Sequence, residues 1–129
     1  MSFTVARFLS CGIWFFAGMF KLTHFRHICA DMAKHGIPLQ PMFLVLVIIL
    51  EIGGSALIFA NLHVWQVALS WIGFMLLATP IYHGKFIIDG KIFFPEYVQF
   101  SKNISLAGGL IALAALDPAL PAGLRAAFN

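Results

Sequence analysis

Residues 42–60 read MFLVLVIILEIGGSALIFA, a run whose one charged side chain, Glu51, lies at its centre. A bilayer core about 30 Å thick is crossed by about 20 apolar residues in a helix. Three more stretches have this length and character: residues 3–22, 64–83 and 98–116. The sequence therefore predicts an all-α fold, an integral membrane four-helix bundle that forms one membrane domain over residues 1–129.

The composition of the whole chain agrees with this prediction. Hydrophobic residues make up 61% of the chain and charged residues 10%, and the mean hydropathy is +0.94. Soluble domains are about 45–50% apolar and about 25% charged. A net charge of +3 is too small for a surface that binds nucleic-acid phosphates. Two cysteines are too few for a small secreted fold that depends on disulfide bonds. We therefore expect membrane lipid as a partner and no nucleic acid.

Two of the predicted connections carry structure of their own. In the first, the spacing of apolar residues between Thr23 and Pro41 predicts a short interfacial helix, which Gly36 ends. In the last, the pair Asp89-Gly90 separates two β-prone runs and predicts a β-hairpin. The open edges of a hairpin are not tolerated in hydrocarbon, so we expect it at the membrane interface.

The distribution of basic residues predicts the orientation in a bacterial inner membrane. Six of the eight Lys and Arg residues fall on the side of the two long connections, and Arg7 and Arg125 fall on the other side. Basic residues favour the cytoplasmic side. The sequence therefore predicts a multi-pass protein whose long connections are cytoplasmic and whose termini face outward.

Small and polar residues recur on one face of each predicted span, where they would let neighbouring helices approach closely. These predicted inward faces hold Arg7, Cys11, Trp14, Gly18 and Lys21 in the first span, Glu51, Gly54 and Ser55 in the second, Gln66, Ser70, Gly73 and Pro80 in the third, and Lys102, Ser105, Gly109 and Ala112 in the fourth.

Glu51 is the strongest candidate for a functional residue. An ionised side chain deep in a span costs about 2.5–3.5 kcal/mol and by default marks a functional site. Arg7, about one turn inside the outer boundary, has a side chain long enough for us to expect a Glu51–Arg7 pair. Such a pair also has a purely structural interpretation, in which it fixes the helix register.

A second group of polar residues is expected near the cytoplasmic boundary: Lys21, His83 and Asn103. We expect these side chains to ring a pocket beneath the long connections. Each also has a simpler role, as a snorkelling anchor, an interfacial histidine or a bridge between helices. His24, His27 and Asp31 fit a solvated helix face better than a metal site, and no pair of facing histidines suits a haem.

Several short motifs, in this order and spacing, resemble the DoxX family of small bacterial four-helix membrane proteins. They cover the chain from Arg7 to about Leu116 and comprise Arg7, Gly18-x-x-Lys21, Gly36-Ile37-Pro38, Glu51-x-Gly53-Gly54, Ala78-Thr79…His83 and Asn103…Gly108-Gly109. The resemblance implies an inner-membrane bundle. It also implies a link to redox enzymes, because the family takes its name from a small subunit of a quinone-linked oxidase complex and its members are often described as oxidoreductases or as their accessory partners.

Five residues carry the expected ligand contacts: Arg7, Lys21, Glu51, His83 and Asn103. Glu51 would exchange protons or serve as a counter-charge, Arg7 would pair with it, and Lys21 and His83 would donate hydrogen bonds to a polar head such as a quinone carbonyl. No catalytic residue and no metal ligand is assigned, and a quinone is the one cofactor that the resemblance implies.

Three functions stay open at this point. The first, which we favour, is an accessory subunit of a redox complex, bound to other membrane subunits or to copies of itself. The second is a self-sufficient small oxidoreductase, against which the lack of a nucleotide-binding motif or thiol pair in the sequence weighs. The third is a carrier of a small solute or proton, against which the lack of an inverted repeat weighs. Whether the chain is itself an enzyme is left open.

Overall fold

The computed structural model describes residues 2–128, so Met1 and Asn129, the ends of the predicted domain, lie outside the described residues. The chain forms two compact units, the first ending at Val67 and the second beginning at Ala68. The elements in chain order are α1 (Ser2–Thr23), α2 (Phe25–Lys34), α3 (Gln40–Ile48), the π-helical segment η1 (Ile49–Gly53), α4 (Gly54–Phe59), α5 (Val64–His83), β1 (Ile87–Ile88), β2 (Lys91–Ile92), α6 (Phe94–Ala115) and α7 (Ala122–Ala126).

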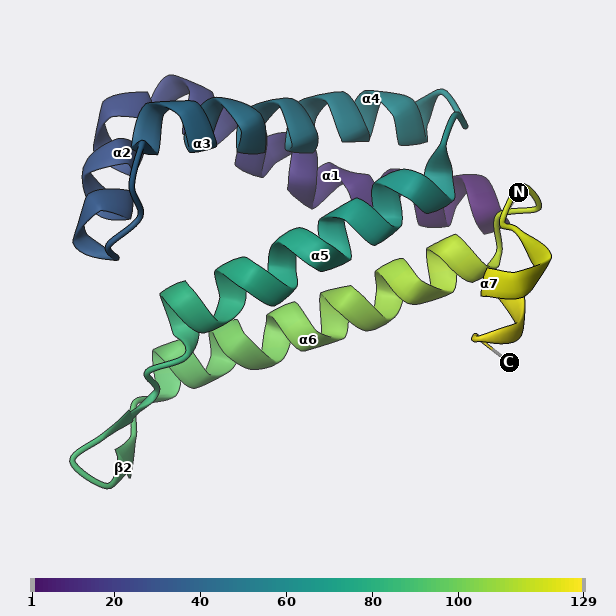
Figure 1. Ribbon diagram of the computed structural model, residues 1–129. Coiled ribbons are helices and arrows are strands. Elements are labelled where there is room, and N and C mark those ends of the chain that lie inside the picture. Colours follow the sequence, from purple (N-terminus) through teal and green to yellow (C-terminus); the bar gives the residue numbers. More distant parts are fainter. Residues whose placement is uncertain (1, 129) are drawn as a thin grey trace. The chain divides into compact units, whose positions relative to one another are not determined.

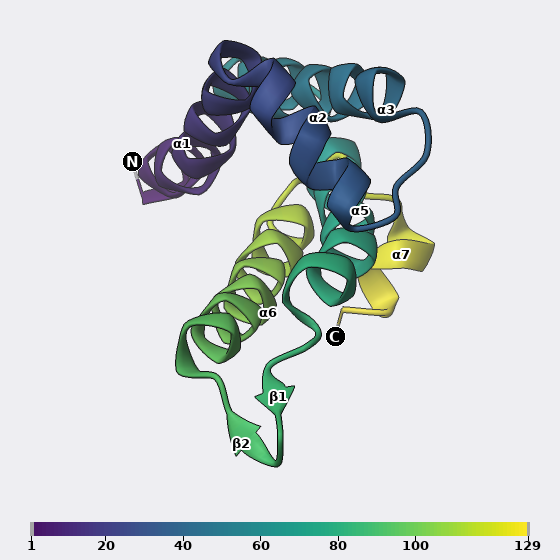
Figure 2. The ribbon, with the colours of Figure 1, turned by 90° about the vertical axis from the view of Figure 1, so that its left-hand side faces the viewer.

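In the first unit, α1 lies along the helix that α3, η1 and α4 form together, and the two run antiparallel (Figures 1 and 2). At one end, the rings of Phe8 and Phe59 are 4.9 Å apart. Nearer the other end, the backbone at Gly18 lies against Ile52. The short α2 connects α1 to α3 and confirms the helix predicted in the first connection.

Two helices of this unit, α2 and α4, end in backbone turns that the sequence encodes. After α2, Gly36 has a positive φ of 75°, and the N–H groups of Gly36 and Ile37 donate to the C=O groups of Ala33 and Met32. This is a Schellman motif, which satisfies the last carbonyls of a helix. Asn61, with φ 59°, ends α4 by the same pattern.

A π-helical segment interrupts the second predicted span at Glu51. Residues 40–59 run as one helix, but Ile49–Gly53 adopts π-helical hydrogen bonding. A π segment accommodates an extra residue in the turn, and such segments occur often at functional sites. The one acidic residue of this span therefore lies where the helix is irregular.

In the second unit, α5 and α6 run antiparallel and side by side, with the hairpin at the end where they join (Figures 1 and 2). Ile87 pairs with Ile92, and Ile88 pairs with Lys91. Both turn residues have positive φ, 51° at Asp89 and 73° at Gly90, as a two-residue type I′ hairpin requires. The hairpin predicted from Asp89-Gly90 is confirmed.

The predicted spans are confirmed as helices. Within residues 2–128, three stretches are long and apolar enough to cross a membrane: Thr4–Thr23, Gln40–Phe59 and Val64–His83. Helix α6 is slightly longer, at 22 residues, but polar side chains lower the hydropathy of its first half. It begins at Phe94, about one turn before the predicted start at Val98.

The predicted inward faces are correct for the first two spans and wrong for the last two. Cys11, Trp14 and Ser55 are buried. On α5, in contrast, Ser70, Gly73 and Pro80 are exposed, and on α6 Ser105, Gly109 and Ala112 are exposed. The buried residues there include large apolar ones such as Trp71 and Leu113, together with Ala68 and Ala114; large side chains have more apolar area to bury.

Candidate functional site

The first unit holds an ion pair between its two antiparallel helices. Nζ of Lys21, on α1, lies 2.8 Å from Oε1 and 2.9 Å from Oε2 of Glu51, on η1. The Glu51 side chain is only 2% exposed, whereas that of Lys21 is 23% exposed. The ammonium therefore donates to both carboxylate oxygens and lies on the more accessible side of the pair.

Gly18 makes this pair geometrically feasible. It lies one turn before Lys21, on the same face of α1. A Cβ at residue 18 would lie 2.7 Å from Cγ1 of Ile52 and 3.1 Å from Cβ of Glu51. Because glycine has no Cβ, the backbones of α1 and η1 approach closely enough for the Lys21 side chain to reach Glu51.

A buried hydrogen bond continues the contact toward the other end of α1. The Ser55 hydroxyl lies 2.7 Å from the C=O of Glu51 and 3.3 Å from the C=O of Cys11. Both Cys11 and Ser55 are fully buried. The hydroxyl thus ties α1 to the residue whose carboxylate binds Lys21, and it fixes the relative register of the two helices.

The predicted Glu51–Arg7 pair is wrong, because Glu51 binds Lys21. Gly18 lies beside Ile52, and Arg7 is eleven residues before Gly18 on α1. At about 1.5 Å per residue, Arg7 is displaced by roughly 16 Å along the helix from the level of Glu51. A guanidinium cannot cover that distance.

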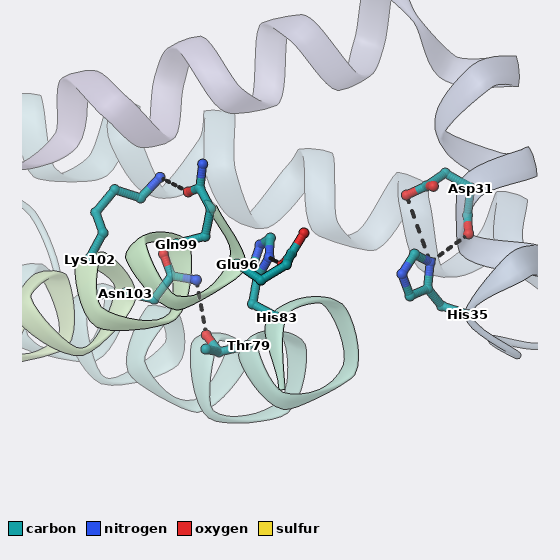
Figure 3. A network of polar contacts seen from close by, with 8 residues as sticks. All are labelled: Asp31, His35, Thr79, His83, Glu96, Gln99, Lys102 and Asn103. Carbon is teal, nitrogen blue, oxygen red and sulfur yellow. Dashed lines mark hydrogen bonds and ion pairs between the residues drawn. The ribbon is translucent and has the colours of Figure 1, made fainter. Parts of the chain in front are cut away.

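His83 and Glu96 form a contact across the base of the hairpin in the second unit. Nδ1 of His83, at the end of α5, lies 2.6 Å from Oε2 of Glu96, in the first turn of α6 (Figure 3). Both side chains are about one-third exposed. Exposed pairs of this kind contribute little to stability, so the main consequence is that the two helix ends are held together.

Asn103 bridges α6 to α5. Its Nδ2 donates to the hydroxyl of Thr79 over 3.1 Å (Figure 3). Beside this bond is a shallow hollow of about 120 Å³. The α5 and α6 side chains that line it include Met75, Thr79, Pro80, Phe100, Asn103 and Ala107.

Of the five predicted site residues, the structure therefore brings together Lys21 and Glu51, and it gives His83 and Asn103 partners of their own. Sequence reasoning missed two residues, Glu96 and Thr79. The signal for Glu96 was available, because His83 and Glu96 each lie four residues beyond the paired Ile87 and Ile92. Extending the hairpin register outward would have placed them opposite each other. Within residues 2–128, no three His, Cys, Asp or Glu side chains gather as a metal site would require.

The sequence of this chain is similar to a known family and to two known proteins. The DoxX family matches residues 2–84. Inner membrane protein YqjF of Escherichia coli (strain K12) is 32% identical over 114 residues, which cover 88% of this chain and 82% of that protein. Inner membrane protein YphA of the same organism is 25% identical over 114 residues, covering 88% of this chain and 81% of that protein. No solved structure matches.

The match to DoxX covers the helices that hold the Lys21–Glu51 pair, and it continues to the end of α5. The apolar helices and the names of the two relatives agree in describing a multi-pass inner-membrane protein. With a match over residues 2–84 and a relative at 32% identity, this chain belongs to the DoxX family.

Proposed function

We propose that the chain binds a lipid-soluble ligand with a polar acceptor head, such as a quinone, at the Lys21–Glu51 pair, and that it acts as an accessory subunit of a quinone-linked redox complex. The observation that supports this is the pair itself, which lies between two helices apolar enough to cross a membrane. Polar groups inside such helices are costly and are kept mainly where they bind or transport something.

The hydrogen-bonding capacity of Lys21 sets the chemistry of the ligand. A lysine ammonium has three N–H donors. Two of them point to the oxygens of Glu51, and within residues 2–128 no partner is recorded for the third. Since Lys21 is the more exposed member of the pair, an approaching head group meets a donor first. The favoured ligand therefore presents an oxygen acceptor, such as a carbonyl, rather than a cation.

The surroundings fit the rest of a quinone. Phe20, next to Lys21 on α1, is 53% exposed, and its ring stacks on that of His24 with the centroids 4.2 Å apart. Flat apolar groups pack well against aromatic rings. A bound quinone would supply two-electron redox chemistry, while this chain would bind the head group and orient it toward a partner subunit.

The remaining predicted ligand residues contribute differently in this proposal. Arg7 lies fourteen residues before Lys21, about 21 Å along α1, so one head group does not reach both. His83 and Asn103 belong to the second unit, and their contact with a ligand stays a prediction from the sequence. Arg7 is thus a suitable control residue for tests of the pair.

Quinone retention tests the proposal. The double variant Lys21→Met/Glu51→Leu removes both charges and leaves apolar side chains of similar size. We expect the wild type, purified in mild detergent from membranes, to carry quinone that extraction and mass spectrometry detect, and the double variant to carry at least tenfold less. Arg7→Gln should retain quinone like the wild type. Equal retention in the double variant would refute this site.

A proton carrier is the second candidate, because a buried carboxylate at a π segment is an arrangement suited to proton transfer. Proton flux into proteoliposomes distinguishes the two candidates. A carrier would show flux that Glu51→Gln abolishes, whereas an accessory subunit would show no flux above that of empty liposomes.

The proposed orientation has both long connections in the cytoplasm and both termini outside. The reason is the six-to-two distribution of Lys and Arg. In a variant without the native cysteines, a single cysteine at Ala127 should react with a membrane-impermeant maleimide added to cells with a permeabilised outer membrane. A cysteine at Asp89 should react only after lysis. The reverse pattern would show the opposite orientation.

A further inference from the structure

The second unit ends in a group of exposed apolar and basic side chains around the hairpin, and we propose that this hairpin surface, residues 82–97, binds the head groups of anionic lipids at the membrane–water interface. The proposal does not depend on the quinone site, which lies in the first unit.

The aromatic residues at this end are typical of a membrane interface. Both tyrosines of the chain, Tyr82 and Tyr97, lie here, beside Phe86, Phe93 and Phe94. Tyr and Trp are enriched where membrane helices enter the head-group layer. Since α5 is apolar enough to cross a membrane and ends at His83, the residues that follow leave the hydrocarbon at this level.

The hairpin is held firmly at its base. The ring of Phe86 lies 5.8 Å from that of Tyr97 and 5.2 Å from that of Phe100, between ring centroids. The N–H of Phe93 donates to the C=O of Phe86 over 2.7 Å, and the His83–Glu96 contact lies just beyond. The hairpin therefore projects in a defined direction from the ends of α5 and α6 (Figures 1 and 2).

Apolar side chains point from both faces of the hairpin. Because Ile87 pairs with Ile92 and Ile88 with Lys91, the first pair lies on one face and the second on the other. Ile87 and Ile92 are each more than 60% exposed, and Ile88 is 52% exposed. A folded partner that docks on one face would leave the other in water, whereas the interfacial layer surrounds both. The open strand edges keep the hairpin out of the hydrocarbon itself.

Two lysines give this surface its charge preference. Lys85 precedes β1 and Lys91 begins β2, and both are exposed. Lysines bury their aliphatic stems in the interface and extend the ammonium to lipid phosphates. The same segment holds two acidic residues, Asp89 at the turn between the lysines and Glu96, which contacts His83. Each basic group near an anionic surface contributes about a fivefold preference at low salt.

Lipid-specific quenching tests the proposal in the full chain. A variant with Cys11→Ala, Cys29→Ser and Ile88→Cys is labelled with an environment-sensitive fluorophore and reconstituted in phosphatidylcholine nanodiscs. A minor fraction of lipid carries a nitroxide on the head group, either of phosphatidylglycerol or of phosphatidylcholine. We expect labelled phosphatidylglycerol to quench several-fold more strongly, and Lys85→Gln/Lys91→Gln to bring the ratio close to one. The same label at Leu77, an exposed side chain within α5, should show no change with the lysine substitutions.

Three results would overturn the proposal. Quenching by an aqueous quencher, but by neither lipid, would show that the hairpin stands in water. A blue-shifted probe that no quencher reaches would show that protein covers it, as a second copy or another subunit would. Equal quenching by both lipids in the wild type would show an interface without charge selectivity. The substituted hairpin residues are exposed, whereas Cys11 is buried, so circular dichroism of the Cys11→Ala/Cys29→Ser parent and of each labelled variant checks the folding.

Discussion

Lys21→Met is expected to lower the free energy of unfolding by about 3–5 kcal/mol, because it leaves the buried carboxylate of Glu51 without its partner. Glu51→Gln should lower the free energy of unfolding by less. The ammonium that it leaves unpaired belongs to Lys21, which is partly exposed and therefore partly solvated. Thermal melting in detergent, followed by circular dichroism, measures both shifts.

The double variant Lys21→Met/Glu51→Leu should recover most of this loss, because a buried ion pair can often be replaced by apolar side chains at little cost. The control is the cycle of Arg7→Gln with Glu51→Gln. Residues that do not meet give additive changes, so this cycle should show no coupling. Coupling between Arg7 and Glu51, together with additivity between Lys21 and Glu51, would contradict the structure.

Gly18→Ala is expected to destabilise the chain by about 1–3 kcal/mol, the usual cost of overpacking. The new methyl group would lie 2.7 Å from Cγ1 of Ile52, so α1 and η1 must move apart. That movement lengthens the Lys21–Glu51 contact, and ligand retention should fall together with the melting temperature.

Gly12→Ala is the matched control on the same helix. A Cβ at Gly12 meets nothing within 4 Å, so this variant should be neutral or slightly stabilised, as expected when alanine replaces glycine in a helix. Adding Ile52→Ala to Gly18→Ala should restore part of the stability by making room for the methyl group. If Gly12→Ala and Gly18→Ala melt alike, close approach at Gly18 is not what positions the pair.

The local parts of the fold could be predicted because their signals are local. Hydropathy alone locates the helix Val64–His83 with the correct ends. The turn at Asp89-Gly90 requires two residues that tolerate positive φ, and the sequence supplies them next to each other. The end of α2 is similarly encoded by one glycine, Gly36.

The partner of Glu51 could not be predicted because it depends on how far α1 is displaced along its neighbour. Counting residues from the ends of each span assumes that both spans begin at the same depth. The connection that contains α2 intervenes between α1 and α3, and no tight turn fixes their register. Gly18 and Ser55 fix it, and both were recognised as parts of small and polar faces. Their contacts with Ile52 and with the C=O of Cys11 are visible only in the structure.

The inward faces of α5 and α6 were predicted wrongly for a different reason. Small and polar residues were expected at the helix contacts, but Gly73 and Gly109 are exposed and Trp71 and Leu110 are buried. Large side chains gain more from packing than small ones do. Asn103 was correctly chosen as a bridging residue, since it binds Thr79 on the neighbouring helix.

The central claim is that Lys21 and Glu51 are paired inside the membrane, and solid-state NMR in lipid bilayers tests it most directly. The chain has only two glutamates, Glu51 and Glu96, so correlations between lysine Nζ and glutamate Cδ are few. We predict one such correlation that persists in Glu96→Gln and disappears in Lys21→Met. A Glu51 carboxyl that correlates with the Arg7 guanidinium, or with no basic group at all, would contradict the account.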